Sequence, residues 1–171
     1  MTRGRKDIGN VLIRDWCEHD LRALHEINQA SVPGVGSLTA ETFSRHVREL
    51  GAPTLVAEAH GIPVGFVLCM LEGRDYTSLN YQWLSERYQT FAYVDRIAVA
   101  PDWRGHQVGE ALYRATVERF HGVRNVLLAE VNLEPPNPGS LRFHKRHGFH
   151  SVGERWENGR SKGVVYLERK L

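Results

Sequence analysis

Residues 93–113 read YVDRIAVAPDWRGHQVGEALY, and this stretch decides the fold. Its start belongs to the segment 91–100, whose nearly continuous apolar end is typical of a buried central strand. The turn PDWRGHQVG leads into a helix predicted over 106–121, and NVLLAEVN at 125–132 predicts the next strand. Because a helix that joins two strands of one sheet crosses over it, this order predicts a parallel pair of strands.

The turn before this helix is suited to bind an anion. The first N–H groups of a helix have no partner inside it, and the helix dipole adds about half a positive charge there. Gly105 and Gly109 allow a ligand to approach the backbone closely, and Arg104 adds a cation. A pyrophosphate fits these features, although the glycines can also serve only the geometry of the turn. The stretch has neither the Gly-Lys-Ser/Thr of a P-loop nor the glycine spacing of a Rossmann fingerprint.

The elements on either side predict a mixed sheet. Before the central stretch we expect strand, helix, helix, strand, strand and short helix, at 11–16, 18–30, 39–50, 53–59, 62–71 and 80–88. After it we expect a short helix at 140–147 and a hairpin around Asn158-Gly159. The sequence therefore predicts an α/β fold with a mixed, mostly antiparallel central sheet of about six to seven strands, a parallel central pair and about four flanking helices.

Length and charge narrow the class of protein. A chain of 171 residues fits a single domain, which we expect over 11–171 after a basic N-terminal tail at 1–10. The formal net charge of +2 disfavours a nucleic-acid-binding protein. No window approaches the roughly 18 apolar residues of a membrane-spanning helix, and the start lacks the apolar stretch of a signal peptide. We therefore expect a cytoplasmic protein without membrane contact.

Two motifs carry a resemblance to a known family. The central stretch resembles the main motif of the GNAT superfamily of acyl-CoA-dependent N-acyltransferases, Arg/Gln-x-x-Gly-x-Gly/Ala after a strand. NPGSLRFHKRHGF at 137–149 resembles its second motif, Asn-x-x-Ala/Ser-x-x-Leu/Phe-Tyr-x-x-x-Gly-Phe. The predicted order of elements is also similar to the family fold, so the resemblance covers nearly the whole chain. Two positions depart from the motifs: Gln107 replaces the middle glycine, and His144 replaces the frequent tyrosine.

The resemblance implies that acetyl-CoA binds as co-substrate. The strand at 93–99 would splay from the strand at 126–132, so that free backbone groups of Ile97 and Val99 pair with the pantetheine arm. The Val99 N–H would face the thioester oxygen, and the diphosphate would lie on the helix start, where Gln107 acts through its N–H. Asn137 would cap the helix of the second motif and bind the cofactor. The expected cofactor-binding residues are Ile97, Ala98, Val99, Arg104, Gly105, His106, Gln107, Val108, Gly109, Glu110, Asn137 and Ser140.

Acetyl transfer needs a neutral amine, a donor for the oxyanion and a proton for the leaving thiolate. We take Asp95 and His144 as the catalytic candidates. The two-residue period of a strand puts Asp95 on the face of Ile97, and the resemblance implies an acidic base near this position. Asp95 can instead pair with a basic group such as Arg96, and water then takes the proton. His144 can donate a proton to the thiolate or serve only as a contact to CoA.

The resemblance implies an acceptor pocket between the first helix pair and the segment before the central strand. That segment, EGRDYTSLNYQWLSERYQT at 72–90, is unusually aromatic. Its aromatic residues either wall a small pocket or pin a surface segment to the sheet. The expected acceptor-binding residues are Asn28, Asn80, Tyr81, Trp83 and Tyr93.

These interpretations predict an acetyl-CoA-dependent N-acetyltransferase that acts by direct attack of a primary amine on a small or amino-acid-like acceptor. A protein or peptide N-terminal acetyltransferase ranks second, because the segment 72–90 would close the open groove that a peptide needs. A non-catalytic acyl-CoA-binding regulator stays open because of Gln107 and His144. No spacing of the histidines predicts a metal site, so we expect no metal. Family members often dimerise, and the resemblance therefore allows a homodimer.

Overall fold

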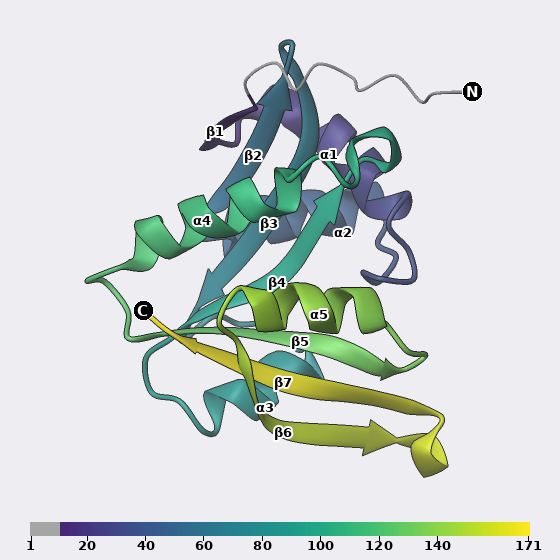
Figure 1. Ribbon diagram of the computed structural model, residues 1–171, viewed down its shortest axis with the longest axis vertical. Coiled ribbons are helices and arrows are strands. Elements are labelled where there is room, and N and C mark those ends of the chain that lie inside the picture. The colour runs from purple at the N-terminus through teal and green to yellow at the C-terminus, as the bar shows by residue number, and fades with distance from the viewer. Residues whose placement is uncertain (1–10) are drawn as a thin grey trace.

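The structure, a computed structural model, describes residues 11–171. A seven-stranded sheet runs through it in the order β1-β2-β3-β4-β5-β7-β6 (Figure 1). The strands are β1 (Leu12–Asp15), β2 (Thr54–Ala59), β3 (Ile62–Leu71), β4 (Ala92–Val99), β5 (Val126–Glu134), β6 (His150–Glu157) and β7 (Lys162–Lys170). All neighbouring strands are antiparallel except β4 and β5. The predicted fold class, with its parallel central pair, is confirmed.

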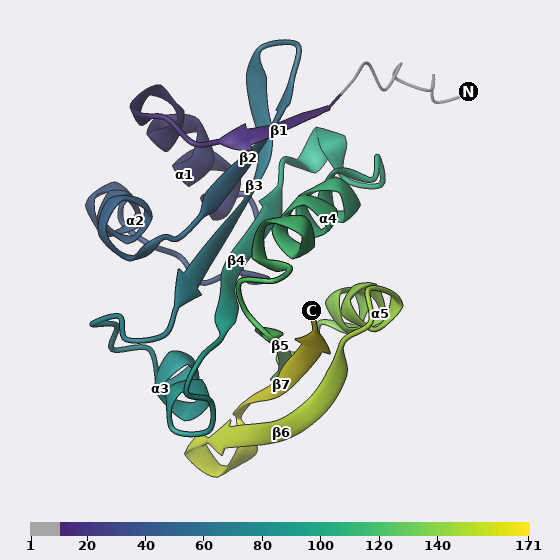
Figure 2. The same ribbon diagram turned by 90° about the vertical axis from the view of Figure 1, so that its left-hand side faces the viewer.

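Five α-helices cover the two faces of the sheet. They are α1 (Leu21–Gln29), α2 (Ala40–Arg45), α3 (Leu79–Ser85), α4 (Val108–Phe120) and α5 (Pro138–Arg146). α1, α2 and α3 pack on one face through Leu24, Phe43 and Leu84. α4 packs on the other face through Leu112, and Phe143 of α5 joins it there. Figure 2 shows α1 and α2 on one side of the sheet and α4 and α5 on the other.

Element boundaries differ from the predictions where single residues decide them. α4 begins at Val108 rather than at 106, because Gln107 has a left-handed backbone with φ of 61°. α5 begins at Pro138 rather than at 140, since a proline fits the first turn of a helix. Asn137 caps it as predicted, and its side chain accepts a hydrogen bond from Ser140 N (3.2 Å). The tail predicted at 1–10 lies outside the described residues, and no helix in the described part is long and apolar enough to cross a membrane.

The parallel strands β4 and β5 pair over a short distance only. Ala92 pairs with Leu127 and Tyr93 with Leu128, and the two strands then diverge. The predicted splay of these strands is confirmed. Ala100 N–H, just after β4, donates to Val64 O on β3 (2.9 Å). Because backbone groups alternate in direction along a strand, those of residues 97 and 99 point toward the opening.

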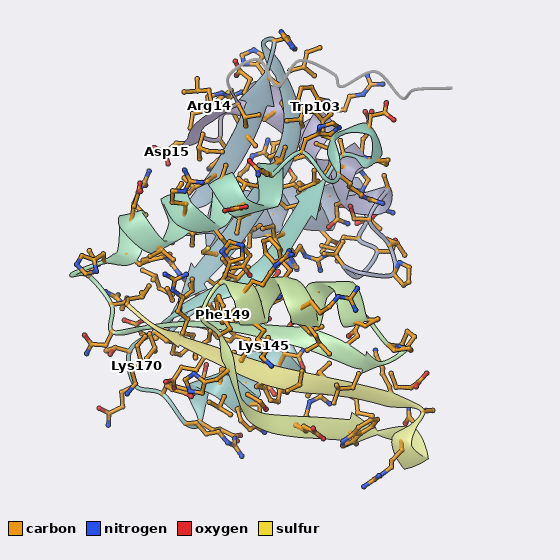
Figure 3. The ribbon with its side chains drawn as sticks, viewed as in Figure 1. Arg14, Asp15, Trp103, Lys145, Phe149 and Lys170 are labelled. Atoms are coloured by element: carbon orange, nitrogen blue, oxygen red, sulfur yellow. The ribbon has the colours of Figure 1, made fainter. Side chains whose placement is uncertain are left out.

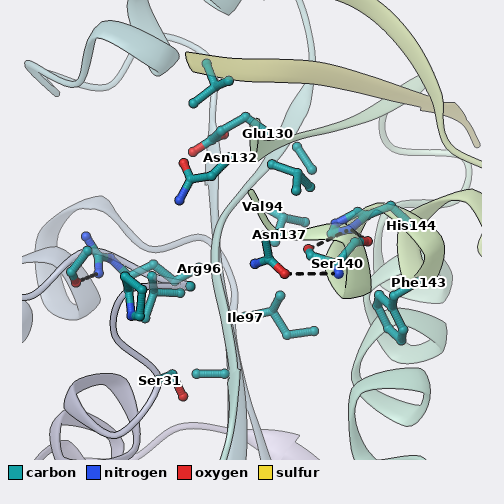
Figure 4. Close-up of a pocket in the computed structure, with 18 of the residues that line it drawn as sticks. Ser31, Val94, Arg96, Ile97, Glu130, Asn132, Asn137, Ser140, Phe143 and His144 are labelled. Carbon is teal, nitrogen blue, oxygen red and sulfur yellow. Dashed lines mark hydrogen bonds between the residues drawn. The ribbon is translucent and has the colours of Figure 1, made fainter. Parts of the chain in front are cut away.

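A β-bulge changes which residues of β4 share a face. Val94 and Arg96 pair with consecutive residues of β3, so that Asp95 is an extra residue in β4. Val94 and Ile97 therefore both pack on the α4 side of the sheet, with two residues between them instead of one. The prediction that Asp95 shares a face with Ile97 is wrong, because the bulge breaks the alternation. Figure 4 shows Arg96 on one side of β4 and Val94 and Ile97 on the other.

Candidate active site

A cleft of about 1190 Å³ opens where β4 and β5 separate. It is bordered by the loop 30–36 after α1, by the start of α4, by α5 and by the β6–β7 hairpin. Its volume exceeds the roughly 300–1,000 Å³ of an ordinary ligand pocket, so it has room for two substrates. Eight of the predicted cofactor-binding residues line it: Ile97, Ala98, Val99, Arg104, Gly105, Gly109, Asn137 and Ser140.

The turn before α4 presents unpaired N–H groups. Gly105 has a φ of 79° and Gln107 a φ of 61°, and such left-handed residues between right-handed ones curl the backbone into a concave shape. The first helical hydrogen bond runs from Ala111 N to Gln107 O (3.0 Å). The amides of residues 108–110 precede this bond and have no acceptor inside the helix. The predicted anion site thus has the backbone geometry that a diphosphate requires.

Four of the predicted cofactor-binding residues do not reach the cleft with their side chains. Val108 is buried in the core beneath α4, and Gln107 and Glu110 are exposed. The ring of His106 lies 6.1 Å from that of Trp103, which stands at the entry to α4 (Figure 3). Their side chains are therefore not part of the lining of this cleft, and their role in a cofactor site stays a prediction.

Arg104 is engaged with the protein itself. Its Nε donates to Val99 O (3.1 Å), and its Nη2 donates to Ala30 O (2.9 Å) and to Ser31 Oγ (3.2 Å). Arg104 thus ties the loop after α1 to the end of β4. The carbonyl of Val99 is occupied by this contact, which leaves the Val99 N–H as the group available to a ligand. A direct contact of Arg104 with phosphate stays a prediction.

α5 approaches α4 closely because of Gly109. A Cβ atom at this position would lie 3.4 Å from Cζ of Phe143, a tight contact. Any longer side chain would have to displace the Phe143 ring. The glycine therefore serves the packing of two helices as well as the open amides of the turn.

His144 and Tyr113 form a buried pair on the α4 side of the cleft. Tyr113 Oη and His144 Nε2 are 2.6 Å apart, and His144 Nδ1 lies 2.8 Å from Ser140 O. A carbonyl only accepts, so Nδ1 carries the proton and Nε2 accepts from the Tyr113 hydroxyl. Burial lowers the pKa of His144, which keeps the ring neutral. Sequence reasoning missed Tyr113, although it lies four residues after Gly109 and hence on the same face of the helix.

Asp95 and Arg96 form an ion pair, as the alternative interpretation predicted. Asp95 Oδ2 lies 3.2 Å from Arg96 Nε. Arg96 Nη1 also donates to Asn28 Oδ1 (3.0 Å) and Gly36 O (2.6 Å), which fixes the loop after α1. Burial raises the pKa of Asp95, and the charge of Arg96 opposes this effect. The side chain faces the α1–α3 side of the sheet, where His46 and Tyr76 influence its charge.

Glu130 is a second carboxylate of the cleft that sequence reasoning missed. Its Oε1 accepts from Asn80 Nδ2 (3.1 Å), and its Oε2 is buried with no hydrogen-bond partner among residues 11–171. Burial, with a contribution from the charge of Asp95, raises the pKa of Glu130 to about 8. The sequence signal that could have pointed to Glu130 is its place as a lone acidic residue inside the apolar run NVLLAEVN. A carboxylate with a pKa in this range is suited to accept protons near neutral pH.

Only one of the predicted acceptor residues lines the cleft. This is Asn80, whose Oδ1 accepts from Arg155 Nη2 (2.9 Å) and Tyr166 Oη (3.1 Å). Trp83 stacks on Tyr166 with ring centroids 3.9 Å apart. Tyr81 is buried, and its hydroxyl donates to a backbone carbonyl of β3 (2.5 Å). The aromatic residues of α3 thus pin it to the sheet, which is the other interpretation of this segment.

Asn28 and Tyr93 are both fully buried and do not line the cleft. Asn28 Nδ2 donates to Gly36 O (3.3 Å) and so helps to shape the loop after α1. The Tyr93 hydroxyl has no hydrogen-bond partner in the described part of the chain and lies near both Asp95 and Glu130, whose charges raise its pKa further after burial. A contact of either residue with an acceptor stays a prediction.

Comparison with known proteins agrees with this architecture. The chain belongs to the acetyltransferase (GNAT) family, whose family model matches residues 15–149. An uncharacterized N-acetyltransferase of Methanocaldococcus jannaschii is 33% identical over 95 residues, which are 55% of this chain and 37% of that protein. The chain thus spans little more than a third of the length of this curated relative.

Two solved structures show the same fold at low sequence identity. The ribosomal-protein-S18-alanine N-acetyltransferase of Escherichia coli has a TM-score of 0.72 and 17% identity, with 94% of both chains covered. A putative phosphinothricin N-acetyltransferase has a TM-score of 0.70 and 21% identity, with 95% of this chain and 99% of that chain covered. One acts on a protein and the other is named for a small molecule, so the shared fold leaves the acceptor class open.

Proposed function

We propose that the protein transfers the acetyl group of acetyl-CoA to a primary amine of a small molecule by direct attack. One observation carries this proposal. A single cleft joins the amide-rich turn before α4 to two buried carboxylates through the gap between β4 and β5. The turn suits a diphosphate, the strand edges suit the amides of a pantetheine arm, and the carboxylates suit an amine.

The gap between the strands lets two substrates meet from opposite faces of the sheet. Tyr113 and Phe143 lie on the α4 side, which is the side of the amide-rich turn. Asn80 contacts Glu130 from α3, on the opposite side. Acetyl-CoA would therefore enter along α4 and α5, and the amine would approach from the side of α1 and α3. The Val99 N–H points into the gap and would donate to the thioester oxygen, where negative charge develops.

Glu130 is the group that we assign to remove the proton of the amine. Its Oε2 has no hydrogen-bond partner among residues 11–171 and so keeps an unused acceptor site, and its raised pKa of about 8 makes it a stronger base than an ordinary carboxylate. Asp95 acts on it through charge, since two neighbouring carboxylates resist being ionised together. Asp95 thus supports the base, and its pairing with Arg96 keeps it in place.

α3 supports a small acceptor over a long one. Its Asn80 bridges Glu130 on β5 and Arg155 on β6, and thereby walls the acceptor end of the cleft. The free N-terminus of a protein is the alternative acceptor.

Thiol release from acetyl-CoA tests the proposal. The assay uses a panel of small primary amines and a matched panel of peptides with free N-termini. Turnover with small amines supports the proposal. Turnover with peptides alone would show that the acceptor is the free N-terminus of a peptide instead of a small molecule. CoA binding measured by calorimetry without any turnover would instead indicate a regulator that binds acyl-CoA.

A further inference from the structure

We propose that Arg104 is a positioning residue for the acceptor, which holds the loop 30–36 across the cleft instead of binding the phosphates of CoA. This inference rests on the proposed function and concerns the connection between the two ends of its cleft. Arg104 directly precedes Gly105 at the amide-rich turn, whereas the loop 30–36 follows α1 on the acceptor side of the sheet. A side chain that starts at the cofactor turn thus ends at the acceptor loop.

The N–H groups of Arg104 that a phosphate would need are already used by the protein. Nε donates to Val99 O (3.1 Å), and Nη2 donates to Ala30 O (2.9 Å) and to Ser31 Oγ (3.2 Å). An arginine binds a phosphate most strongly through two parallel N–H groups. Because both N–H groups of Nη2 have acceptors in the protein, such a contact would break a hydrogen bond to the loop. The backbone amides of the turn suit a diphosphate without this side chain.

The loop 30–36 extends from the acceptor side of the cleft to the start of α5. Every residue of the loop lines the cleft. A Cβ atom at Gly34 would lie 3.7 Å from Asn137 Nδ2, so the middle of the loop approaches the N-terminal cap of α5. Figure 4 shows Ser31 on the opposite side of β4 from Phe143. A displacement of the loop therefore changes the shape of the acceptor end.

Two arginines, one from β4 and one from the turn after it, hold the two ends of the loop. Arg96 Nη1 donates to Gly36 O (2.6 Å) at the end of the loop, and Arg104 holds its start. Between these anchors the Val35 amide donates to Ser31 O (3.2 Å). The ion pair on the acceptor side fixes Arg96, whereas Arg104 is exposed. Substitution of Arg104 therefore leaves no cavity in the core and removes one anchor of the loop.

The first test compares Arg104→Ala and Arg104→Lys with the wild type, using the amine that the wild type acetylates fastest. We expect KM for this amine to rise by about tenfold in both variants, because neither keeps the fork that holds the loop. We expect kcat to change less. The Kd of CoA, measured by calorimetry, should stay within about twofold of the wild-type value, since the amides of the turn remain. A Kd that rises in Arg104→Ala and recovers in Arg104→Lys would overturn the proposal, because a lysine still supplies a charge to a phosphate.

Hydrogen exchange tests the contact with the loop without any turnover. Amides of the loop 30–36, such as that of Val35, should exchange about tenfold faster in Arg104→Ala, because local opening becomes easier when an anchor is lost. Ser31→Ala removes one of the three acceptors of Arg104 and should give a smaller change in the same direction. Unchanged exchange in Arg104→Ala would overturn the positioning role.

A matched variant and the wild type complete the test. Arg48→Ala removes an exposed arginine whose Nε and Nη2 donate to Glu18, and neither of these residues lines the cleft. It should change neither the exchange of the loop nor KM for the amine, and equal effects in Arg48→Ala and Arg104→Ala would overturn the proposal. A wild-type protein that binds CoA but acetylates no amine would overturn the proposed function, and with it the acceptor as the ligand that the loop serves.

Discussion

Glu130→Gln separates the catalytic and structural effects of the buried carboxylate. With a pKa of about 8, Glu130 is ionised in about a tenth of molecules at pH 7 and in about nine tenths at pH 9. If the ionised form is the base, kcat/KM rises roughly tenfold over this range. Glutamine keeps the shape and the contact with Asn80 but cannot take a proton. We expect a rate loss of about 10²–10⁴-fold, and the rise between pH 7 and 9 should disappear.

The same substitution should stabilise the fold at high pH. The unfolded chain ionises Glu130 near its ordinary value of 4.5, whereas the folded chain keeps it protonated up to about pH 8. Between these values the folded state binds the extra proton, so stability falls as pH rises, by up to about 1.4 kcal/mol per pH unit. Glu130→Gln removes this dependence, and its advantage over the wild type should grow from pH 5 to pH 8 and then stay constant.

Two assays check this prediction on one pair of proteins. Initial rates are measured from pH 6.5 to 9.5 with an amine whose own pKa lies below this range, so that the acceptor does not titrate. Urea unfolding at pH 5 and pH 8 gives the difference in stability. A variant that keeps the wild-type pH profile would refute the assignment of Glu130 as base. A difference in stability between the variant and the wild type that does not grow from pH 5 to pH 8 would refute the buried, protonated state of Glu130.

Three further substitutions probe the two ends of the cleft. Gly109→Asp should weaken CoA binding by more than tenfold, or about 1.4 kcal/mol, because it places a carboxylate at the amide-rich turn and displaces Phe143. An unchanged affinity for CoA, measured by calorimetry, would show that the diphosphate does not bind at this turn. Gln107→Gly should raise stability by up to about 1 kcal/mol, since it relieves a φ of 61°, and should keep or improve CoA affinity; a large loss of affinity would show that the amide side chain binds the cofactor. Asp95→Asn should shift the midpoint of the pH–rate profile to lower pH, because the substitution removes a charge that raises the pKa of Glu130. An unchanged midpoint would show that the charge of Asp95 does not affect Glu130.

Local signals predicted the frame of the site. The crossover between the segments 91–100 and 125–132 predicted the parallel pair, and the sheet contains it. Asn137 at the start of the second motif was predicted to cap the helix that follows, and the structure shows the hydrogen bond. The splay of β4 from β5 came from the resemblance alone, since nothing in the composition of either strand says where pairing stops.

The reacting side chains were harder to predict because they depend on contacts between distant segments. The two-residue period of a strand predicted that Asp95 and Ile97 lie on the same face of the sheet. A single bulged residue puts them on opposite faces. Glu130 looked like one acidic residue in an apolar strand, and only its burial beside Asp95 raises its pKa and makes it a candidate base. Tyr113 became part of the site because α5 brings His144 to it.

The bulge at Asp95 explains how one strand serves both substrates. Regular alternation from Tyr93, which packs on the α1–α3 side, would turn the Arg96 side chain toward α4, into the path proposed for the cofactor, and would turn Ile97 away from it. The extra residue instead puts Asp95 and Arg96 on the acceptor side and leaves Val94 and Ile97 on the cofactor side. Arg96 then holds the loop after α1 through Gly36 O, while Asp95 raises the pKa of Glu130. In the proposed function, the charges that prepare the amine are thereby kept on the face of the sheet opposite to the path of the cofactor.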